Sequence, residues 1–164
     1  MIQIGIVDDK SLNRKMIRQN LYGISNIEII LEAVNGLDFL EKIKALNLQK
    51  LPNVVLIDLD MPAMNGIETI AIASIRFPTI KFIVLTVFDD DEKIFEAIKA
   101  GASGYLLKDD APDMLLDAIH NAYELNGAPM SPAIARKTLL WLKQGAQPYP
   151  TPSTTTDHIR NSLT

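Results

Sequence analysis

The sequence predicts an α/β fold in which a parallel sheet is covered by helices on both faces. Five short apolar runs of strand length alternate with segments in which apolar residues recur at intervals of three and four, the spacing of an amphipathic helix. The runs are almost continuously apolar, as strands are when both faces of their sheet are buried. Parallel neighbours need a crossover connection, and the intervening segments are long enough to supply one.

The strands follow from the apolar runs, taken in chain order. We expect them at Ile2–Val7, Ile27–Val34, Val54–Ile57, Ile80–Leu85 and Tyr105–Leu107. A helix is expected after each strand, because apolar residues there share one helical face. The residues that define the first four helices are Leu12, Met16, Ile17 and Leu21; Leu37, Leu40, Ile43 and Leu46; Ile67, Ile70, Ala71 and Ile75; and Ile94, Ala97 and Ile98. The fifth helix is expected over Met114 to Leu125.

Local signals mark where these helices begin and end. Ser11 can cap the first helix, and Asn35-Gly36 interrupts the chain before the second. Pro78 follows the third helix, and Gly101 stands where a glycine commonly ends a helix. These boundaries agree with the apolar pattern.

Length and composition divide the 164 residues into one domain and a remainder, at roughly 150 residues per domain. Residues 1–125 hold the five strand and helix units. Residues 126–143 hold an appended helix, expected over Ser131 to Lys143, which contains the only tryptophan, Trp141. Residues 144–164 are rich in proline, serine and threonine and have the composition of a flexible linker.

The composition excludes several classes of function. The chain has no cysteine, which excludes disulfide frameworks, cysteine-ligated metals and thiol catalysis. Its formal net charge of −4 repels nucleic acid, so these residues alone are not expected to bind DNA. Asp8 and Asp9 interrupt the first apolar run, which suits neither a signal peptide nor a membrane span. We therefore expect a cytoplasmic protein without a membrane partner.

Candidate functional residues follow four of the five expected strands. They are Asp8 and Asp9 after the first, Asp58 and Asp60 after the third, Thr86 after the fourth and Lys108 after the fifth. In open α/β sheets, ligands bind at the carboxyl ends of the strands. If the first and third strands are neighbours, Asp8, Asp9 and Asp58 converge there. Three carboxylates so close repel one another, so either some of them are protonated or a cation binds between them. Oxygen ligands favour Mg²⁺ or Mn²⁺ as that cation.

Taken singly, each of these residues has an ordinary structural explanation, such as helix capping, turn formation or surface solvation. Together they supply what phosphoryl transfer to a carboxylate requires: a nucleophile, metal ligands, a hydroxyl donor and a cation. The sequence has no GxxxxGK[ST], GxGxxG or GxSxG motif, so the phosphoryl group is expected to come from another molecule.

These residues and their surroundings resemble the receiver domain of bacterial two-component response regulators, in the NarL/FixJ-like subfamily with a C-terminal LuxR-type helix-turn-helix. The resemblance lies in Asp8-Asp9, in VLIDLDMPAMNG around Asp58, in LT at Thr86 and in GASGYLLKD around Lys108, and it covers about residues 1–125. The later segment APMSPAIARKTLL resembles the inter-domain helix of that subfamily. The resemblance implies a flavodoxin-like (βα)5 sandwich with strand order 2-1-3-4-5.

The resemblance also implies a role for each residue. Asp58 would accept a phosphoryl group from a sensor histidine kinase, with Mg²⁺ or Mn²⁺ bound by Asp9, Asp58 and the backbone carbonyl of Asp60. Asp8 would act on the metal through water. Lys108 would pair with the phosphoryl group, and Thr86 and Tyr105 would move as a coupled switch.

The implied partners extend beyond this chain. The phosphorylated receiver would form a homodimer, often through its first and fifth helices, and would control a DNA-binding domain absent from these 164 residues. The Leu163-Thr164 pair resembles the opening of such a domain. The protein would then be a signalling protein and not an enzyme, apart from its self-catalysed phosphoryl transfer and autodephosphorylation.

Two other functions stay open at this point. Asp58-Leu59-Asp60 resembles the DxD of haloacid-dehalogenase-type phosphatases, although Met61-Pro62 follows it and the acidic pair comes early in the chain. The second is a receiver-like interaction module that is never phosphorylated, although such proteins typically lack a site residue and this chain has them all.

Three further features concern the surroundings of the site. Val87 and the Asp60 side chain differ from the commonest residues at their positions, which suggests an altered phosphoryl lifetime. The acidic run Asp89 to Glu92 is interpreted as the first turn of a helix and not as a second metal site.

Overall fold

The structure, a computed structural model, describes residues 1–144 and contains a single five-stranded parallel sheet within them. Its strands are β1 (Ile2–Val7), β2 (Ile27–Ala33), β3 (Val54–Ile57), β4 (Lys81–Thr86) and β5 (Gly104–Leu107). Its helices are α1 (Ser11–Leu21), α2 (Gly36–Ala45), α3 (Gly66–Arg76), α4 (Asp91–Ala100), α5 (Pro112–Glu124) and α6 (Pro132–Lys143), with a short 3-10 turn, η1 (Leu48–Lys50), before β3.

The strand order is β2-β1-β3-β4-β5, which confirms the predicted flavodoxin-like arrangement. The appended helix is confirmed as α6, whereas the linker expected over 144–164 lies outside the described residues apart from Gln144. None of the helices within residues 1–144 is long and apolar enough to cross a membrane.

Most boundary signals are confirmed, but Ser11 does not cap α1. Ser11 is already the first helical residue, and the position before it, Lys10, has no side-chain cap. The Asp8 carboxylate accepts the Lys10 backbone N–H instead, at 2.9 Å. Asn35 does cap α2, since its side chain accepts from the Asp38 backbone N–H at 2.9 Å.

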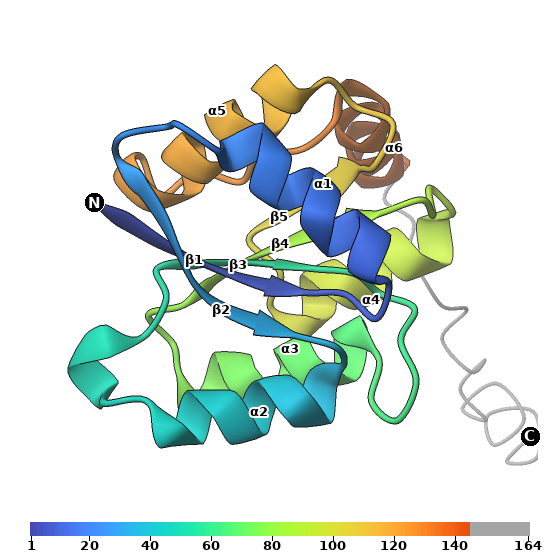
Figure 1. The fold of residues 1–164 in the computed structure, drawn as a ribbon. Coiled ribbons are helices and arrows are strands. Elements are labelled where there is room, and N and C mark those ends of the chain that lie inside the picture. Colours follow the sequence, from blue (N-terminus) through green and yellow to red (C-terminus); the bar gives the residue numbers. More distant parts are fainter. Residues whose placement is uncertain (145–164) are drawn as a thin grey trace, which may run out of the picture.

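Helices cover both faces of the sheet, and each face buries its own apolar core (Figure 1). One core lies under α1 and α5 and includes Ile17 and Ile119. The other lies under α2, α3 and α4 and includes Phe39, Ile70 and Ile94. Because both faces are covered, polar side chains gather at the ends of the strands.

The outer edge of β5 is covered by the segment that leads into α6. The Tyr105 backbone N–H donates to the Pro129 carbonyl at 2.9 Å, and the Ser131 N–H donates to the Tyr105 carbonyl at 3.1 Å. This segment forms a parallel bridge with Tyr105 through Met130. The helix that follows buries Ile134 completely in the core under α4.

Candidate functional site

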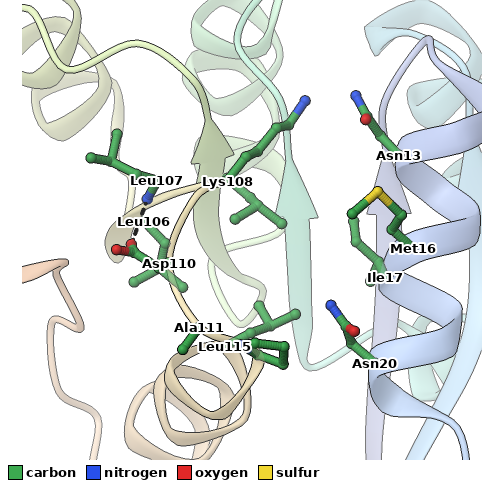
Figure 2. A pocket seen from close by; sticks show the side chains of 12 residues that line it. Asn13, Met16, Ile17, Asn20, Leu106, Leu107, Lys108, Asp110, Ala111 and Leu115 are labelled. Carbon is green, nitrogen blue, oxygen red and sulfur yellow. Dashed lines mark hydrogen bonds between the residues drawn. The ribbon is translucent and has the colours of Figure 1, made fainter.

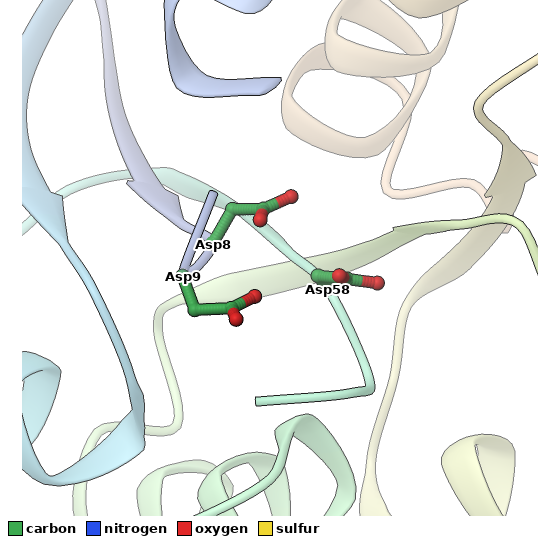
Figure 3. A group of neighbouring side chains, drawn as sticks. All are labelled: Asp8, Asp9 and Asp58. Atoms are coloured by element: carbon green, nitrogen blue, oxygen red, sulfur yellow. The ribbon is translucent and has the colours of Figure 1, made fainter. Parts of the chain in front are cut away.

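Three carboxylates meet at the carboxyl ends of β1 and β3. The two strands are neighbours, and the Asp58 backbone N–H donates to the Val7 carbonyl at 3.0 Å, which places Asp58 beside Asp8. One oxygen each of Asp8, Asp9 and Asp58 lies within 4.8 Å of the others (Figure 3). Asp8 and Asp58 are buried, with 2% and 6% of their surface exposed. The predicted convergence of these three residues is confirmed.

Lys108 lies against two of these carboxylates. Its Nζ is 2.9 Å from Asp8 Oδ2 and 3.2 Å from Asp58 Oδ2. The Lys108 backbone N–H donates to the Thr86 carbonyl at 2.8 Å, so pairing of β4 with β5 sets its position. A cation is therefore already placed where negative charge is concentrated.

Burial raises the pKa of Asp58 above its ordinary value. The charge of Lys108 acts in the opposite direction, and the nearby charge of Asp8 adds to the increase. The Asp58 carboxylate is thus poorly solvated, and further positive charge at the site would favour its ionised form.

Asp8 and Asp9 differ in how their oxygens are satisfied. Asp8 accepts hydrogen bonds from Lys108, from the Lys10 backbone N–H and from Asn13 Nδ2, the last at 3.2 Å to Oδ2. Asp9 Oδ1 is buried and has no hydrogen-bond partner among residues 1–144. An unpaired buried carboxylate oxygen is costly unless a ligand satisfies it. The all-oxygen donor set suits a hard divalent cation such as Mg²⁺, so these residues fit the implied metal.

Thr86 and Tyr105 lie on the side of the site toward β4 and β5, and both are completely buried. The Thr86 hydroxyl oxygen accepts from the Phe88 backbone N–H at 3.5 Å, and the hydroxyl acts on the Asp58 carboxylate to lower its pKa, against the larger effect of burial. The Tyr105 hydroxyl donates to the Phe88 carbonyl at 2.7 Å, in the loop that follows Thr86. Burial, and then the negative charges of Asp90, Asp89 and Asp58, raise the pKa of Tyr105, so the phenol remains a donor.

Two of the residues considered at the sequence level lie outside this cluster of side chains. The Asp60 side chain is exposed and does not belong to the carboxylate group found among residues 1–144. Val87 is 64% exposed at the surface of the loop after β4.

Two residues that help to build the site were missed at the sequence level. They are Asn13, whose amide binds the Asp8 carboxylate, and Arg14, whose Nη1 donates to the Asp8 carbonyl at 2.6 Å. Both lie in the first turns of α1, directly after the acidic pair. The sequence signal for these two residues was a polar side chain in the first turn of a helix that must pack against the sheet.

The loop that follows Asp58 is tightly built. The Gly66 backbone N–H donates to the Leu59 carbonyl at 2.9 Å, and a Cβ on Gly66 would lie 2.2 Å from the Asp58 carbonyl oxygen. Only glycine permits this approach of α3 to the residue that follows β3. Ala63 in the same loop adopts a positive φ of 68°. The loop therefore fixes Asp58 from its backbone side.

A cavity of about 80 Å³ adjoins the site between α1 and the segment that follows β5 (Figure 2). Lys108 and Asn13 line one end of it, and apolar residues such as Met16 and Leu115 line the remainder. Lys108 thus borders both the carboxylates and this cavity.

Comparison with known proteins shows which family and which relatives this chain is similar to. A family model described as "Response regulator receiver domain" matches residues 4–120. YxjL of Bacillus subtilis (strain 168), described as an uncharacterized transcriptional regulatory protein, is 39% identical over 121 residues, covering 74% of this chain and 54% of its own length. The nitrate/nitrite response regulator protein NarP of Escherichia coli (strain K12) is 38% identical over 117 residues, covering 71% of this chain and 53% of its own length.

The solved structures lead to the same group. A two-component response regulator of the LuxR family from Aurantimonas sp. SI85-9A1 superimposes with a TM-score of 0.76 at 25% identity, over 84% of this chain and 95% of that one. The chain spans about half the length of the curated relatives it matches, as the shares of 54% and 53% show.

Proposed function

Because the chain belongs to the response regulator receiver domain family, we propose that Asp58 accepts a phosphoryl group from a phosphohistidine of a sensor histidine kinase. The observation that carries this proposal is the position of Lys108, whose Nζ contacts both Asp8 and Asp58 in a cluster that also contains Asp9. A carboxylate nucleophile, a fixed cation and a free metal ligand then occupy one site.

The reaction follows from what each group offers. An Asp58 carboxylate oxygen forms the new bond to phosphorus, and the bond from phosphorus to the histidine nitrogen breaks, with its electron pair left on the imidazole. Lys108 is within reach of the transferred oxygens and offsets their charge. The Thr86 hydroxyl, which acts on the Asp58 carboxylate before transfer, can donate to a phosphoryl oxygen afterwards.

Asp9, Asp58 and the backbone carbonyl of Asp60 are the residues that would hold Mg²⁺, or Mn²⁺ in its place. The metal would neutralise charge on the transferred phosphoryl oxygens. Asp8 supports this site from outside the metal's own ligands, because Lys108, Lys10 and Asn13 already use its oxygens.

The output of the site is proposed from its relatives. Several are named transcriptional regulatory proteins, and this chain, which matches a receiver over residues 4–120, spans only part of their length. We propose that residues 1–125 are the receiver of a cytoplasmic regulator. Residues 126–143 would join it to a linker and a LuxR-type DNA-binding domain, and phosphorylation would promote a homodimer. The chain would catalyse only its own phosphorylation and dephosphorylation.

The phosphatase alternative is not favoured by the position of Asp60. The Asp60 side chain is exposed and lies outside the carboxylate cluster found among residues 1–144, so the carboxylates of Asp58 and Asp60 do not act together at this site. The interaction-module alternative predicts that no phosphoryl group is accepted, and direct measurement separates it from the proposal.

The experiment is incubation with Mg²⁺ and acetyl phosphate, or with a phosphorylated kinase, followed by intact-mass measurement. We expect one added phosphoryl group, which the Asp58→Asn variant should lack. Asp117→Asn, which removes an exposed carboxylate on α5, is the matched control and should still accept it. An adduct that persists in Asp58→Asn would refute the assignment of the acceptor.

A further inference from the structure

The C-terminal helix α6 is held against the loop between β4 and α4, which directly follows Thr86 and is also bound by Tyr105. Lys137 Nζ donates to the Asp89 carbonyl at 2.6 Å and lies 3.6 Å from the Asp91 carboxylate. The Tyr105 hydroxyl donates to the carbonyl of Phe88, one residue earlier. Adjacent carbonyls of one loop are therefore bound by a side chain of α6 and by a side chain of β5.

The start of α6 is fixed to the carboxyl end of β5. Ser131 is 1% exposed, and its hydroxyl accepts from the Leu107 backbone N–H at 3.0 Å. The same hydroxyl donates to Asp110, whose carboxylate also accepts from the Leu107 N–H at 3.0 Å. Leu107 immediately precedes Lys108, so α6 is connected to the chain position that carries the site cation.

The end of α6 packs on α4. The rings of Trp141 and Phe95 are stacked, with centroids 4.0 Å apart and an interplanar angle of 29°. Ile134, the third residue of α6, is completely buried in the core under α4. The helix is thus attached at three places, namely β5, the loop after β4, and α4.

We propose that the surface formed by β5, α4 and the loop between β4 and α4 is an intramolecular docking surface for residues 129–143. We further propose that α6 docking is energetically coupled to the phosphoryl group on Asp58. The coupling rests on the proposed function, because it needs a phosphoryl group at Asp58. The occupant of this surface is a named segment of the same chain, which the structure shows in place.

The sign of the coupling follows from which loop arrangement α6 contacts. In the docked structure Tyr105 is completely buried, and its hydroxyl and Lys137 hold the loop together. The Thr86 hydroxyl oxygen accepts from the Phe88 backbone N–H at 3.5 Å, so a phosphoryl group that accepts a hydrogen bond from Thr86 holds this hydroxyl, and with it the loop, in the same arrangement. Coupling between two sites is reciprocal. Occupation of Asp58 should therefore tighten α6 docking, and loss of α6 contacts should weaken binding at Asp58.

Trp141 provides the first readout, because it is the only tryptophan in the chain and lies in the α6 contact. The probe is beryllofluoride with Mg²⁺, a mimic of the phosphoryl group. We expect its addition to reduce acrylamide quenching of Trp141 fluorescence, since tighter docking shields the indole ring. The same addition to Asp58→Asn should change nothing.

The second readout is the affinity for beryllofluoride, measured by calorimetry in Mg²⁺ buffer. Lys137→Met should weaken binding about fivefold, the lower end of the usual range for coupled sites. Arg136→Met removes the same charge from an exposed neighbouring position on α6 and should bind as the unmodified chain does. Both variants keep the buried residues Ser131 and Ile134, so both should fold.

The outcomes separate the two proposals. If beryllofluoride binds but Trp141 quenching and the Lys137→Met affinity are unchanged, the coupling is refuted and Asp58 remains the acceptor. If neither beryllofluoride nor acetyl phosphate modifies the site, the proposed function fails, and the coupling with it. Equal weakening in Arg136→Met and Lys137→Met would also overturn the coupling, because the effect would then be one of general charge.

Discussion

Replacement of Lys108 by methionine tests how the site balances its charges. Methionine keeps most of the volume of the side chain and removes the ammonium group that lies 2.9 Å from Asp8 Oδ2 and 3.2 Å from Asp58 Oδ2. The side chains concerned are 17%, 3% and 7% exposed for Lys108, Asp8 and Asp58. The variant therefore leaves two buried carboxylates facing each other with no compensating cation.

The size of the effect can be worked from this geometry. Removing one partner of a buried ion pair costs about 3–5 kcal/mol of unfolding free energy. Water reaches part of Lys108, and Asp58 can take up a proton, so we expect a loss of about 3 kcal/mol without metal. Mg²⁺ at about ten times its Kd returns about 1.4 kcal/mol, because it binds only the folded state. The variant should also bind Mg²⁺ more tightly than the unmodified chain, since a competing cation is gone.

The assay is urea unfolding in EDTA and in saturating Mg²⁺, for Lys108→Met, Asp58→Asn and the double variant. In the double variant the repulsion between Asp8 and Asp58 is absent, so it should recover much of the loss. Lys143→Met, at an exposed position on α6, controls for loss of a lysine. If Lys108→Met in EDTA unfolds at the same urea concentration as the unmodified chain, Lys108 does not offset the charges of Asp8 and Asp58, and the reasoning is wrong. A double variant no more stable than Lys108→Met would contradict it as well.

Three further predictions concern Asp58 and the loop that follows it. Because burial raises the folded-state pKa of Asp58, its ionisation costs stability as pH rises above the ordinary value of 3.8. Asp58→Asn should thus unfold at higher urea concentration than the unmodified chain near neutral pH, and the difference should shrink toward about pH 4; an equal difference at both pH values would contradict this reasoning. Ala63→Gly should raise the unfolding free energy by up to about 1 kcal/mol, because alanine is strained at a φ of 68°; calorimetric melting checks it, and a lower Tm would disprove the strain. Gly66→Ala should lower the Tm and slow phosphoryl acceptance, because the new Cβ would lie 2.2 Å from the Asp58 carbonyl oxygen; unchanged acceptance by intact mass would show that the loop tolerates the shift.

The convergence of the site could be predicted from the sequence because strand topology determines it. Asp8, Asp58 and Lys108 each follow a strand, and parallel strands bring their carboxyl ends to one edge. No side-chain detail was needed for that inference. The inference also requires knowing which strands are neighbours in the sheet. The alternation of strands and helices, together with the resemblance to receiver domains, supplied this order.

The contacts made by α1 and α6 could not be predicted in the same way. An apolar pattern indicates which face of a helix is buried but not which element it packs against, so α6 was expected while its stacking of Trp141 on Phe95 was not. Ser11 has a residue type that favours capping, yet the Asp8 carboxylate accepts the Lys10 N–H and the helix begins at Ser11 itself. Asn13 contributes to the site only because α1 turns it toward Asp8.

The bridge between Tyr105 and Met130 has a consequence for how copies of the protein behave in solution. An edge strand with free N–H and C=O groups is a template on which another chain can add a strand, which leads to aggregation. The Pro129 carbonyl and the Ser131 N–H occupy the outward groups of Tyr105. A chain that ended at residue 125 would keep all five strands but expose this edge. Residues 126–131 therefore belong with the receiver whenever it is expressed alone, as protection against intermolecular sheet formation.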